Sequence, residues 1–353
     1  MMDENIDAFI ALLRAGLWEK DALLSVNNKI DYNVVLRFAE QQSVVGLVAA
    51  GIEHIKDKKV PQEIVLQFVG QAIQLEQRNQ AMNAFISGLV AKMRNSEIYT
   101  LLVKGQGVAQ RYERPLWRVS GDVDFLLSNS NYKKAKNFLL PLSSRNKHEE
   151  RYSQHLGMTI EGWYVEIHGS LRTGLSTRVD KTIDEVQNDV FYGGNVRSWN
   201  NDGTTIFLPA PDNDVFFVFT HFIKHFYKEG MNLRQICDWC RLLWTYRYDV
   251  KPDVLEERLR KAGLMEEWKA FATLAVDYLG MPKEAMPLND ESKRWSKKAK
   301  NILNLIVWDY RQQVVRDTWK IAKIFPWHTL KFLPAIIFNV NVLKIKERLY
   351  GNV

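Results

Sequence analysis

Residues 118–127 read RVSGDVDFLL, and this stretch decides the fold. Its aliphatic and aromatic residues predict a buried strand over about residues 123–127. Side chains alternate along a strand, so Asp122 and Asp124 should point the same way, roughly 6 to 7 Å apart. Like charges at the end of a buried strand repel each other, and carboxylate oxygens at this spacing can share one or two Mg²⁺ ions. We therefore expect a metal site at this aspartate pair rather than two surface charges.

A third carboxylate, Glu166, lies on the next predicted strand, at residues 163–167. Its neighbours are apolar, so it should face the same edge of the sheet as the aspartates. Three carboxylates suffice to hold the two ions of a phosphoryl-transfer site. We expect Glu166 to act as a metal ligand or general base, with a structural salt bridge as the alternative. His168 lies on the same strand face, either in the pocket of the site or as a core histidine.

The sequence KGQG at residues 104–107 joins a predicted strand (98–103) to a predicted short helix (108–112). Amides at a helix N-terminus favour phosphate, and glycine lets the backbone approach a ligand closely. The lysine either binds phosphate or pairs with a carboxylate. An arginine and a serine near the aspartate strand could add phosphate or substrate contacts. The candidate contacts are Lys104, Gly105, Gly107, Arg118 and Ser120.

Strands and helices alternate across the middle of the chain, with a helix predicted at residues 132–140. Residues 196–199 and 204–208 flank the turn sequence NNDG, which predicts a hairpin. Helical periodicity dominates before and after this part. We predict an α+β fold: an N-terminal helical region (1–95), an α/β core with a small mixed sheet (96–210) and a C-terminal helical region (211–353). Helices are expected at 62–94, 216–226, 233–246, 252–262, 265–279 and 290–321.

The composition indicates a globular protein with an anionic partner. Hydrophobic residues make up 46% of the 353 residues, which excludes disorder as the main state. The net charge of +7 favours nucleotide, nucleic acid, phosphorylated sugar or an acidic membrane surface. Cys237 and Cys240 exclude a disulfide framework and are expected to be buried thiols. The N-terminus lacks the pattern of a signal peptide, and no stretch reaches the ~20 apolar residues of a spanning helix, so we expect a cytoplasmic protein.

Other polar residues of the C-terminal region have plainer interpretations. His221 and His225 lie one helical turn apart and can ligate zinc, but no third ligand is evident. Packing or a place in a substrate pocket is therefore favoured for both. Asp238 is expected to cap its helix or pair with Arg234, with a contact to the site as the alternative.

The tail, residues 315–353, is basic and aromatic, with seven Lys or Arg and two Asp or Glu, hence about +5. Peripheral membrane contact through residues 325–348, or stacking on a nucleic acid, is one interpretation. A helix that packs on the core is the interpretation we favour.

The ordered motifs resemble the uncharacterised nucleotidyltransferase family of the polymerase-beta-like superfamily. The similarity is carried by the KG turn, Pro115, Arg118 and the sequence GDVDFLL at residues 121–127. VEIH at residues 165–168, the two spaced histidines and LRQICD at residues 233–238 also match, so the resemblance spans about residues 95–245. It implies a small mixed sheet, Mg²⁺ at the aspartate pair, and transfer of a nucleotidyl group from a nucleoside triphosphate, ATP among them, to an acceptor.

The resemblance leaves the acceptor open, with a sugar or small molecule of surface-polysaccharide or peptide-modification metabolism favoured and nucleic acid as an alternative. The chain departs from the superfamily at two points. Lys104-Gly105-Gln106 replaces the usual Gly-Ser turn, and Glu166 replaces an aspartate. The first departure motivates one alternative, a non-catalytic nucleotide- or sugar-binding module. The basic charge and the basic tail motivate another, an RNA-binding or RNA-modifying protein.

Overall fold

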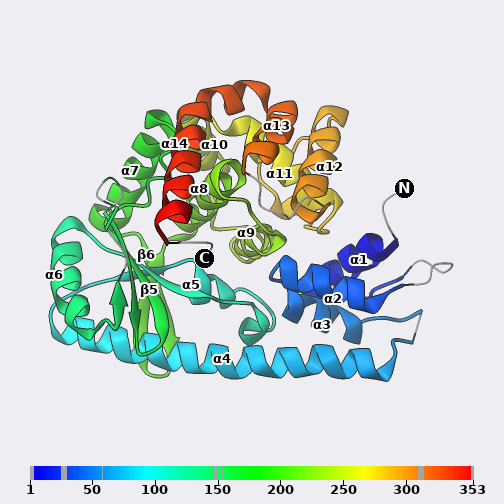
Figure 1. The fold of residues 1–353 in the computed structure, drawn as a ribbon, viewed down its shortest axis with the longest axis horizontal. Helices are drawn as coiled ribbons and strands as arrows, with labels where there is room; N and C mark the ends of the chain where they lie inside the picture. Colours follow the sequence, from blue (N-terminus) through cyan, green and yellow to red (C-terminus); the bar gives the residue numbers. More distant parts are fainter. Residues whose placement is uncertain are drawn as a thin grey trace.

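The computed structural model describes residues 4–24, 30–57, 59–146, 149–150, 152, 154–308 and 314–350. It has the predicted α+β fold, with helices packed around a mixed sheet (Figure 1). The described residues form one seven-stranded sheet in the order β3-β4-β5-β2-β1-β7-β6. The strands are β1 Leu101–Val103, β2 Asp122–Leu126, β3 Arg145–Asn146, β4 His155–Ile160, β5 Trp163–His168, β6 Val196–Asn201 and β7 Thr204–Pro209.

Helices account for the rest of the regular structure (Figure 1). The side chain of Asp31 caps α2 by accepting from the amides of Asn33 and Val34, as its position predicts. The helices are α1 Glu4–Trp18, α2 Tyr32–Gln41, α3 Val45–Glu53, α4 Gln62–Asn95, α5 Gly105–Ala109, α6 Asn129–Leu139, α7 Thr177–Tyr192, α8 Pro211–Lys228, α9 Leu233–Thr245, α10 Pro252–Ala262, α11 Met265–Asp277, α12 Lys293–Trp308, α13 Val314–Ile324 and α14 Pro326–Tyr350.

The centre of the sheet is the parallel pairing of β2 with β5, which sets Asp124 beside Glu166. β1 runs antiparallel to β2 and parallel to β7, whereas β4 runs antiparallel to β5. Because successive side chains point to opposite sides of a strand, β2 and β5 present two different faces. The apolar residues Val123 and Phe125 are buried on one face, and the acidic residues lie on the other.

The apolar face of the sheet is covered by α4 and α6. Buried residues of the second half of α4 pack against β2 and β5, and α6 adds Tyr132 and Leu139 to the same cluster. This half of α4 therefore belongs to the core of the sheet. The residues that α4 contributes are Met82, Ile86, Leu89, Val90 and Met93.

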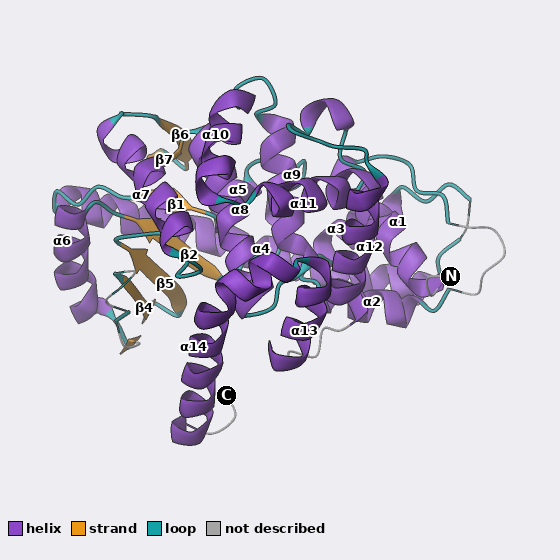
Figure 2. Cartoon of the chain, turned by 90° about the horizontal axis from the view of Figure 1, so that it is seen from above, coloured by secondary structure: helices purple, strands orange, loops and turns teal. Residues whose placement is uncertain are grey.

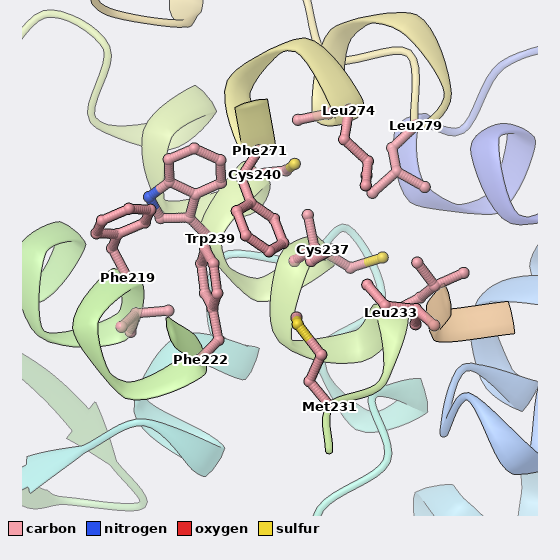
Figure 3. Close-up of a cluster of buried hydrophobic side chains, with 14 of the residues drawn as sticks. Phe219, Phe222, Met231, Leu233, Cys237, Trp239, Cys240, Phe271, Leu274 and Leu279 are labelled. Carbon is pink, nitrogen blue, oxygen red and sulfur yellow. The ribbon is translucent and has the colours of Figure 1, made fainter. Parts of the chain in front are cut away.

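The C-terminal helices form a second apolar core beside the sheet. Trp239 of α9 packs edge-on against Phe222 of α8 and Trp268 of α11, with ring centroids 5.6 and 4.7 Å apart. Cys237 and Cys240 lie within this core as buried free thiols, as predicted (Figure 3). Burial raises the pKa of both thiols, which suits packing rather than redox chemistry.

The tail packs on this core through α14, as favoured from the sequence. Phe332 is buried and meets the Tyr227 ring of α8 edge-on at 4.9 Å, whereas Trp327 and Phe338 are exposed. Figure 2 shows the last turns of α14 projecting away from the body. Among the described helices, none combines the length and apolarity that crossing a bilayer requires.

Three elements are missed by the sequence interpretation. β3 and β4 extend the sheet beyond β5, and Glu161-Gly162, both with positive φ, form the tight β4–β5 turn. Two positive φ values in a two-residue loop are typical of a hairpin, so the dipeptide Glu161-Gly162 is a sequence signal for the β4–β5 hairpin. The third is α7, which begins after the N-cap Ser176 and buries Val179, Ile183, Val186 and Val190 at helical spacing.

Other predicted boundaries are wrong. The short helix begins at Gly105 rather than at residue 108, so KGQG forms its start instead of a preceding turn. The strand before it covers only Leu101–Val103. The helix expected at residues 290–321 corresponds to α12 and α13, between which residues 309–313 lie outside the described part. The division into three regions stays a proposal.

The N-terminal helices cross at contacts too close for a side chain. A Cβ at Gly51 of α3 would lie 2.0 Å from the Leu12 carbonyl oxygen of α1, and a Cβ at Gly16 of α1 would lie 1.8 Å from the Leu47 oxygen. A Cβ at Gly46 would similarly meet the Trp117 oxygen at 1.9 Å. These glycines let α3 touch both α1 and the loop that leads into β2.

We expect Gly51→Ala to destabilise the protein by about 1–3 kcal/mol, because the added methyl must displace backbone of α1. Gly88→Ala on α4 is the matched control, since nothing lies within 4 Å of the position that its Cβ would take. Removing a helical glycine there should stabilise the protein by about 0.5–1 kcal/mol. Urea unfolding of both variants measures the difference, and equal effects would show that the α1–α3 contact is not tight.

Candidate active site

Three carboxylates converge on the polar face of the sheet. Asp122 and Asp124 come from β2 and Glu166 from the adjoining β5. Each offers an oxygen, and these oxygens all lie within 4.8 Å of one another. The side chain of Asp124 is only 2% exposed and that of Glu166 is 17% exposed. The pairing register alone brings these predicted ligands together.

Asp124 contacts two basic side chains. Lys104 Nζ lies 2.7 Å and His168 Nε2 lies 2.8 Å from its Oδ1 atom. Burial opposes ionisation of Asp124, but these two neighbours hold its pKa below the ordinary value. Lys104 thus pairs with a carboxylate, one of the two roles expected for it, and His168 lies at the site rather than in an apolar core.

Asp122 differs from its neighbour because no hydrogen bond or ion pair engages its carboxylate among the described residues. The charge of Asp124, together with burial, raises the pKa of Asp122. Its lone pairs are therefore available to a ligand, and a cation bound there would relieve the repulsion.

His155 is a site residue that the sequence interpretation misses. As the first residue of β4 it stands opposite His168, and the two rings stack with centroids 4.6 Å apart. Its Nε2 atom lies 3.1 Å from Glu166 Oε2. Burial opposes the charged ring, but the nearby carboxylates of Glu150 and Glu166 raise the pKa of His155 to about 9. Recognising the β4–β5 hairpin would place this histidine at the site.

Glu166 links two possible ligand groups. One is the carboxylate trio, and the other combines Glu166 with His155 and His168, again with ligand atoms within 4.8 Å. Burial opposes ionisation of Glu166, yet the two histidines hold its pKa well below the ordinary value. The carboxylate trio offers the oxygen donors that Mg²⁺ prefers, so these residues fit the metal that the sequence predicts.

The KGQG segment has a strained start. Lys104 has a φ of 58° and ψ of −151°, a conformation that costs a residue with a side chain about 1–3 kcal/mol. Gly105 and Gly107 are both buried in α5, and a Cβ at Gly107 would lie 2.6 Å from the Leu208 side chain. Gln106 turns inward and donates to Asn79 and Ser120. Packing thus explains Gly107, and a φ of 42° explains Gly105, whereas phosphate contacts there stay a prediction.

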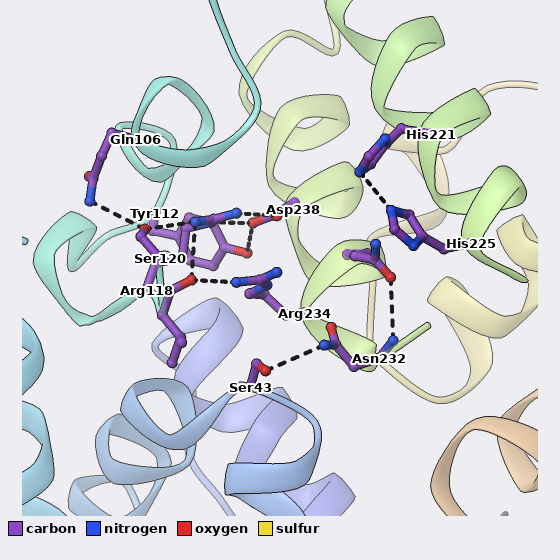
Figure 4. Close-up of polar contacts among 12 residues, drawn as sticks. Ser43, Gln106, Tyr112, Arg118, Ser120, His221, His225, Asn232, Arg234 and Asp238 are labelled. Carbon is purple, nitrogen blue, oxygen red and sulfur yellow. Dashed lines mark hydrogen bonds and ion pairs between the residues drawn. The ribbon is translucent and has the colours of Figure 1, made fainter. Parts of the chain in front are cut away.

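Arg118 forms a buried ion pair across the site. Its Nε and Nη2 atoms donate to Oδ1 and Oδ2 of Asp238 at 2.7 and 2.6 Å, and Nη1 donates to Ser120 Oγ at 2.8 Å (Figure 4). The Tyr112 hydroxyl also donates to Asp238, at 2.7 Å. The partner of Asp238 is thus Arg118 rather than Arg234, which instead donates to the Val119 carbonyl at 2.9 Å.

The two histidines of α8 contact each other, with Nε2 atoms 3.1 Å apart (Figure 4). His225 also pairs with Glu229 through Nδ1 at 2.9 Å. Burial and then the Lys104 charge lower the pKa of His221 well below its ordinary value. Neither histidine belongs to a group of three close metal ligands in the described part of the chain.

Comparisons with known proteins agree with this geometry. A family model described as "Uncharacterised nucleotidyltransferase" matches residues 28–280, more than two thirds of the chain. A solved structure, an antigenic nucleotidyltransferase-like protein from Paracoccidioides brasiliensis, matches with 12% identity and a TM-score of 0.33, covering 56% of this chain and 92% of that chain. A search of curated proteins finds no match. The family model alone therefore carries the assignment.

We expect Lys104→Met to destabilise the protein by about 3 kcal/mol in chelator, because Asp124 loses one partner of a buried pair. A divalent cation should restore stability and should stabilise this variant more than the wild type. Thermal unfolding with EDTA or with Mg²⁺ measures both effects. Lys92→Met, which breaks the exposed Lys92–Glu161 pair, is the control and should lose little in either buffer. A variant that Mg²⁺ does not rescue would argue against cation binding at Asp124.

Proposed function

The chain belongs to the uncharacterised nucleotidyltransferase family, and on that premise we propose that it transfers a nucleotidyl group from a nucleoside triphosphate to an acceptor hydroxyl or phosphate. The observation that carries the proposal is the convergence of Asp122, Asp124 and Glu166 on adjoining strands. Carboxylates that are clustered and buried need cations nearby, and the metal ions bound with a triphosphate would be such cations.

The three carboxylates would hold Mg²⁺, one or two ions, which when bound neutralise phosphate charge and activate the attacking oxygen. In the transfer, the acceptor oxygen forms a bond to the α-phosphorus. The bond between the α-phosphorus and the oxygen that bridges it to the β-phosphorus breaks, and pyrophosphate leaves. The acceptor proton passes to a nearby base, for which Glu166 is the candidate if it is not a ligand. Lys104 and His168 would keep Asp124 ionised and in place throughout.

The depth of the site supports a small acceptor. Asp124 is almost fully buried, and only 17% of each of the Lys104 and Glu166 side chains is exposed. We therefore propose a sugar or another small hydroxyl- or phosphate-bearing molecule as acceptor. The formal charge of +7 keeps RNA as the second candidate, and its binding should then weaken steeply with salt.

A thermal-shift panel of the four ribonucleoside triphosphates with Mg²⁺ tests the proposal. A nucleotide at about 100 times its dissociation constant adds about 2.7 kcal/mol to stability, worth several degrees in a chain of this size. We expect one or more triphosphates to raise the melting temperature of the wild type. Asp122→Asn with Asp124→Asn should abolish this shift because the metal ligands are lost.

The matched control is Asp290→Asn, a surface carboxylate paired with Lys269 on another part of the molecule. It should keep the nucleotide shift. No shift of the wild type with any triphosphate would overturn the proposal. A shift without pyrophosphate release, for every acceptor tested, would point to a non-catalytic nucleotide-binding module.

A further inference from the structure

Arg234, at the start of α9, carries a guanidinium that is only partly used. Nη1 donates to the Val119 carbonyl at 2.9 Å, on the loop that leads into β2. The Nε atom is buried without a hydrogen-bond partner. In the described part of the chain, no hydrogen bond engages Nη2 and no carboxylate forms an ion pair with this side chain. One edge of the guanidinium, Nε and Nη2, is therefore open in the sense that it has no hydrogen-bond partner among the described residues.

The neighbouring groups explain why this edge has no protein partner. Asp238 lies one turn further along α9, where an i, i+4 ion pair with Arg234 could form. Both of its oxygens are taken by Arg118, and Tyr112 donates to one of them (Figure 4). Burial, together with the nearby charge of Arg118, lowers the pKa of Arg234.

Asp122 is a negatively charged group that likewise lacks an ion-pair partner among the described residues. Its carboxylate has no described partner, and it lies three residues after Val119, the residue whose carbonyl Arg234 contacts. No ion pair among the described residues joins the two groups. A ligand with a cation on one side and anionic oxygens on the other would satisfy both groups at once. A metal-bound phosphate has this arrangement of charges.

We propose that Arg234 binds a phosphate group of the nucleotide through its Nε and Nη2 atoms, beside the Asp122 end of the carboxylate trio. This inference rests on the proposed function. The open edge has the fork geometry that receives two phosphate oxygens. The bond from Nη1 to Val119 fixes the fork before the ligand arrives, which lowers the ordering cost of binding. Arg234 would thereby add a phosphate contact to those predicted for the KGQG segment.

Binding of inorganic triphosphate with Mn²⁺, measured by calorimetry, tests this subsite without a base or an acceptor. We expect Arg234→Gln to weaken triphosphate binding about 10- to 100-fold, because a charge-assisted bidentate contact is lost. Arg234→Lys should recover only part of the loss, since an ammonium lacks the fork. Arg260→Gln on α10 is the control, because this arginine is exposed and pairs with Glu256, and it should bind as the wild type does.

Binding of Mn²⁺ alone, followed by electron paramagnetic resonance, separates a phosphate contact from a structural role. Arg234→Gln should bind Mn²⁺ as the wild type does. Unchanged triphosphate binding by this variant would overturn the inference and leave the proposed function standing. Loss of Mn²⁺ binding along with triphosphate would also overturn it, because Arg234 would then only hold the Val119 loop. A wild type that binds neither triphosphate nor nucleotide would overturn both proposals.

Discussion

The parallel pairing of β2 with β5 is the constraint on which the rest of the site depends. It sets Asp124 beside Glu166 inside the protein, where two carboxylates repel each other and are poorly solvated. The surrounding groups offset this repulsion and loss of solvation. Lys104 and His168 contact Asp124, and His155 contacts Glu166. Of the three carboxylates, only Asp122 has no hydrogen bond or ion pair among the described residues, so it is the position at which a ligand has most to gain.

A chain of polar contacts holds the borders of the site together. Asn79 of α4 donates to the Leu116 and Arg118 carbonyls and accepts from Gln106 of α5. Gln106 donates to Ser120, which also accepts from Arg118. Arg118 then binds Asp238 of α9. This network joins α4, α5, the loop before β2 and α9. Each donor that it satisfies would otherwise be a buried group with a desolvation penalty of about 1–3 kcal/mol.

The sequence predicts those parts of the fold and site that depend on local pattern. The strand with Asp122 and Asp124, the strand with Glu166 and the NNDG hairpin all follow from alternation and turn residues. The Arg118–Asp238 pair does not, because 120 residues separate its members and nothing local indicates which acid the arginine meets. His155 escapes prediction for a related reason: its role depends on β4, whose local signs are the Glu161-Gly162 turn and the alternation of Leu156, Met158 and Ile160. Whether Lys104 contacts a phosphate or a carboxylate also depends on tertiary contacts, which the local sequence does not indicate.

The helix α4 has a consequence for how the chain can be divided. Its 34 residues span about 51 Å, with Phe68 packed among the N-terminal helices and Met82 packed on the sheet. Asn79 lies between these two contacts. A recombinant fragment that starts at residue 96 would expose the apolar face of the sheet to water and lose the amide that anchors the loop before β2. A fragment that preserves the site must therefore begin ahead of Asn79, within or before the first half of α4, although the change from helices to strands suggests a cut near residue 96.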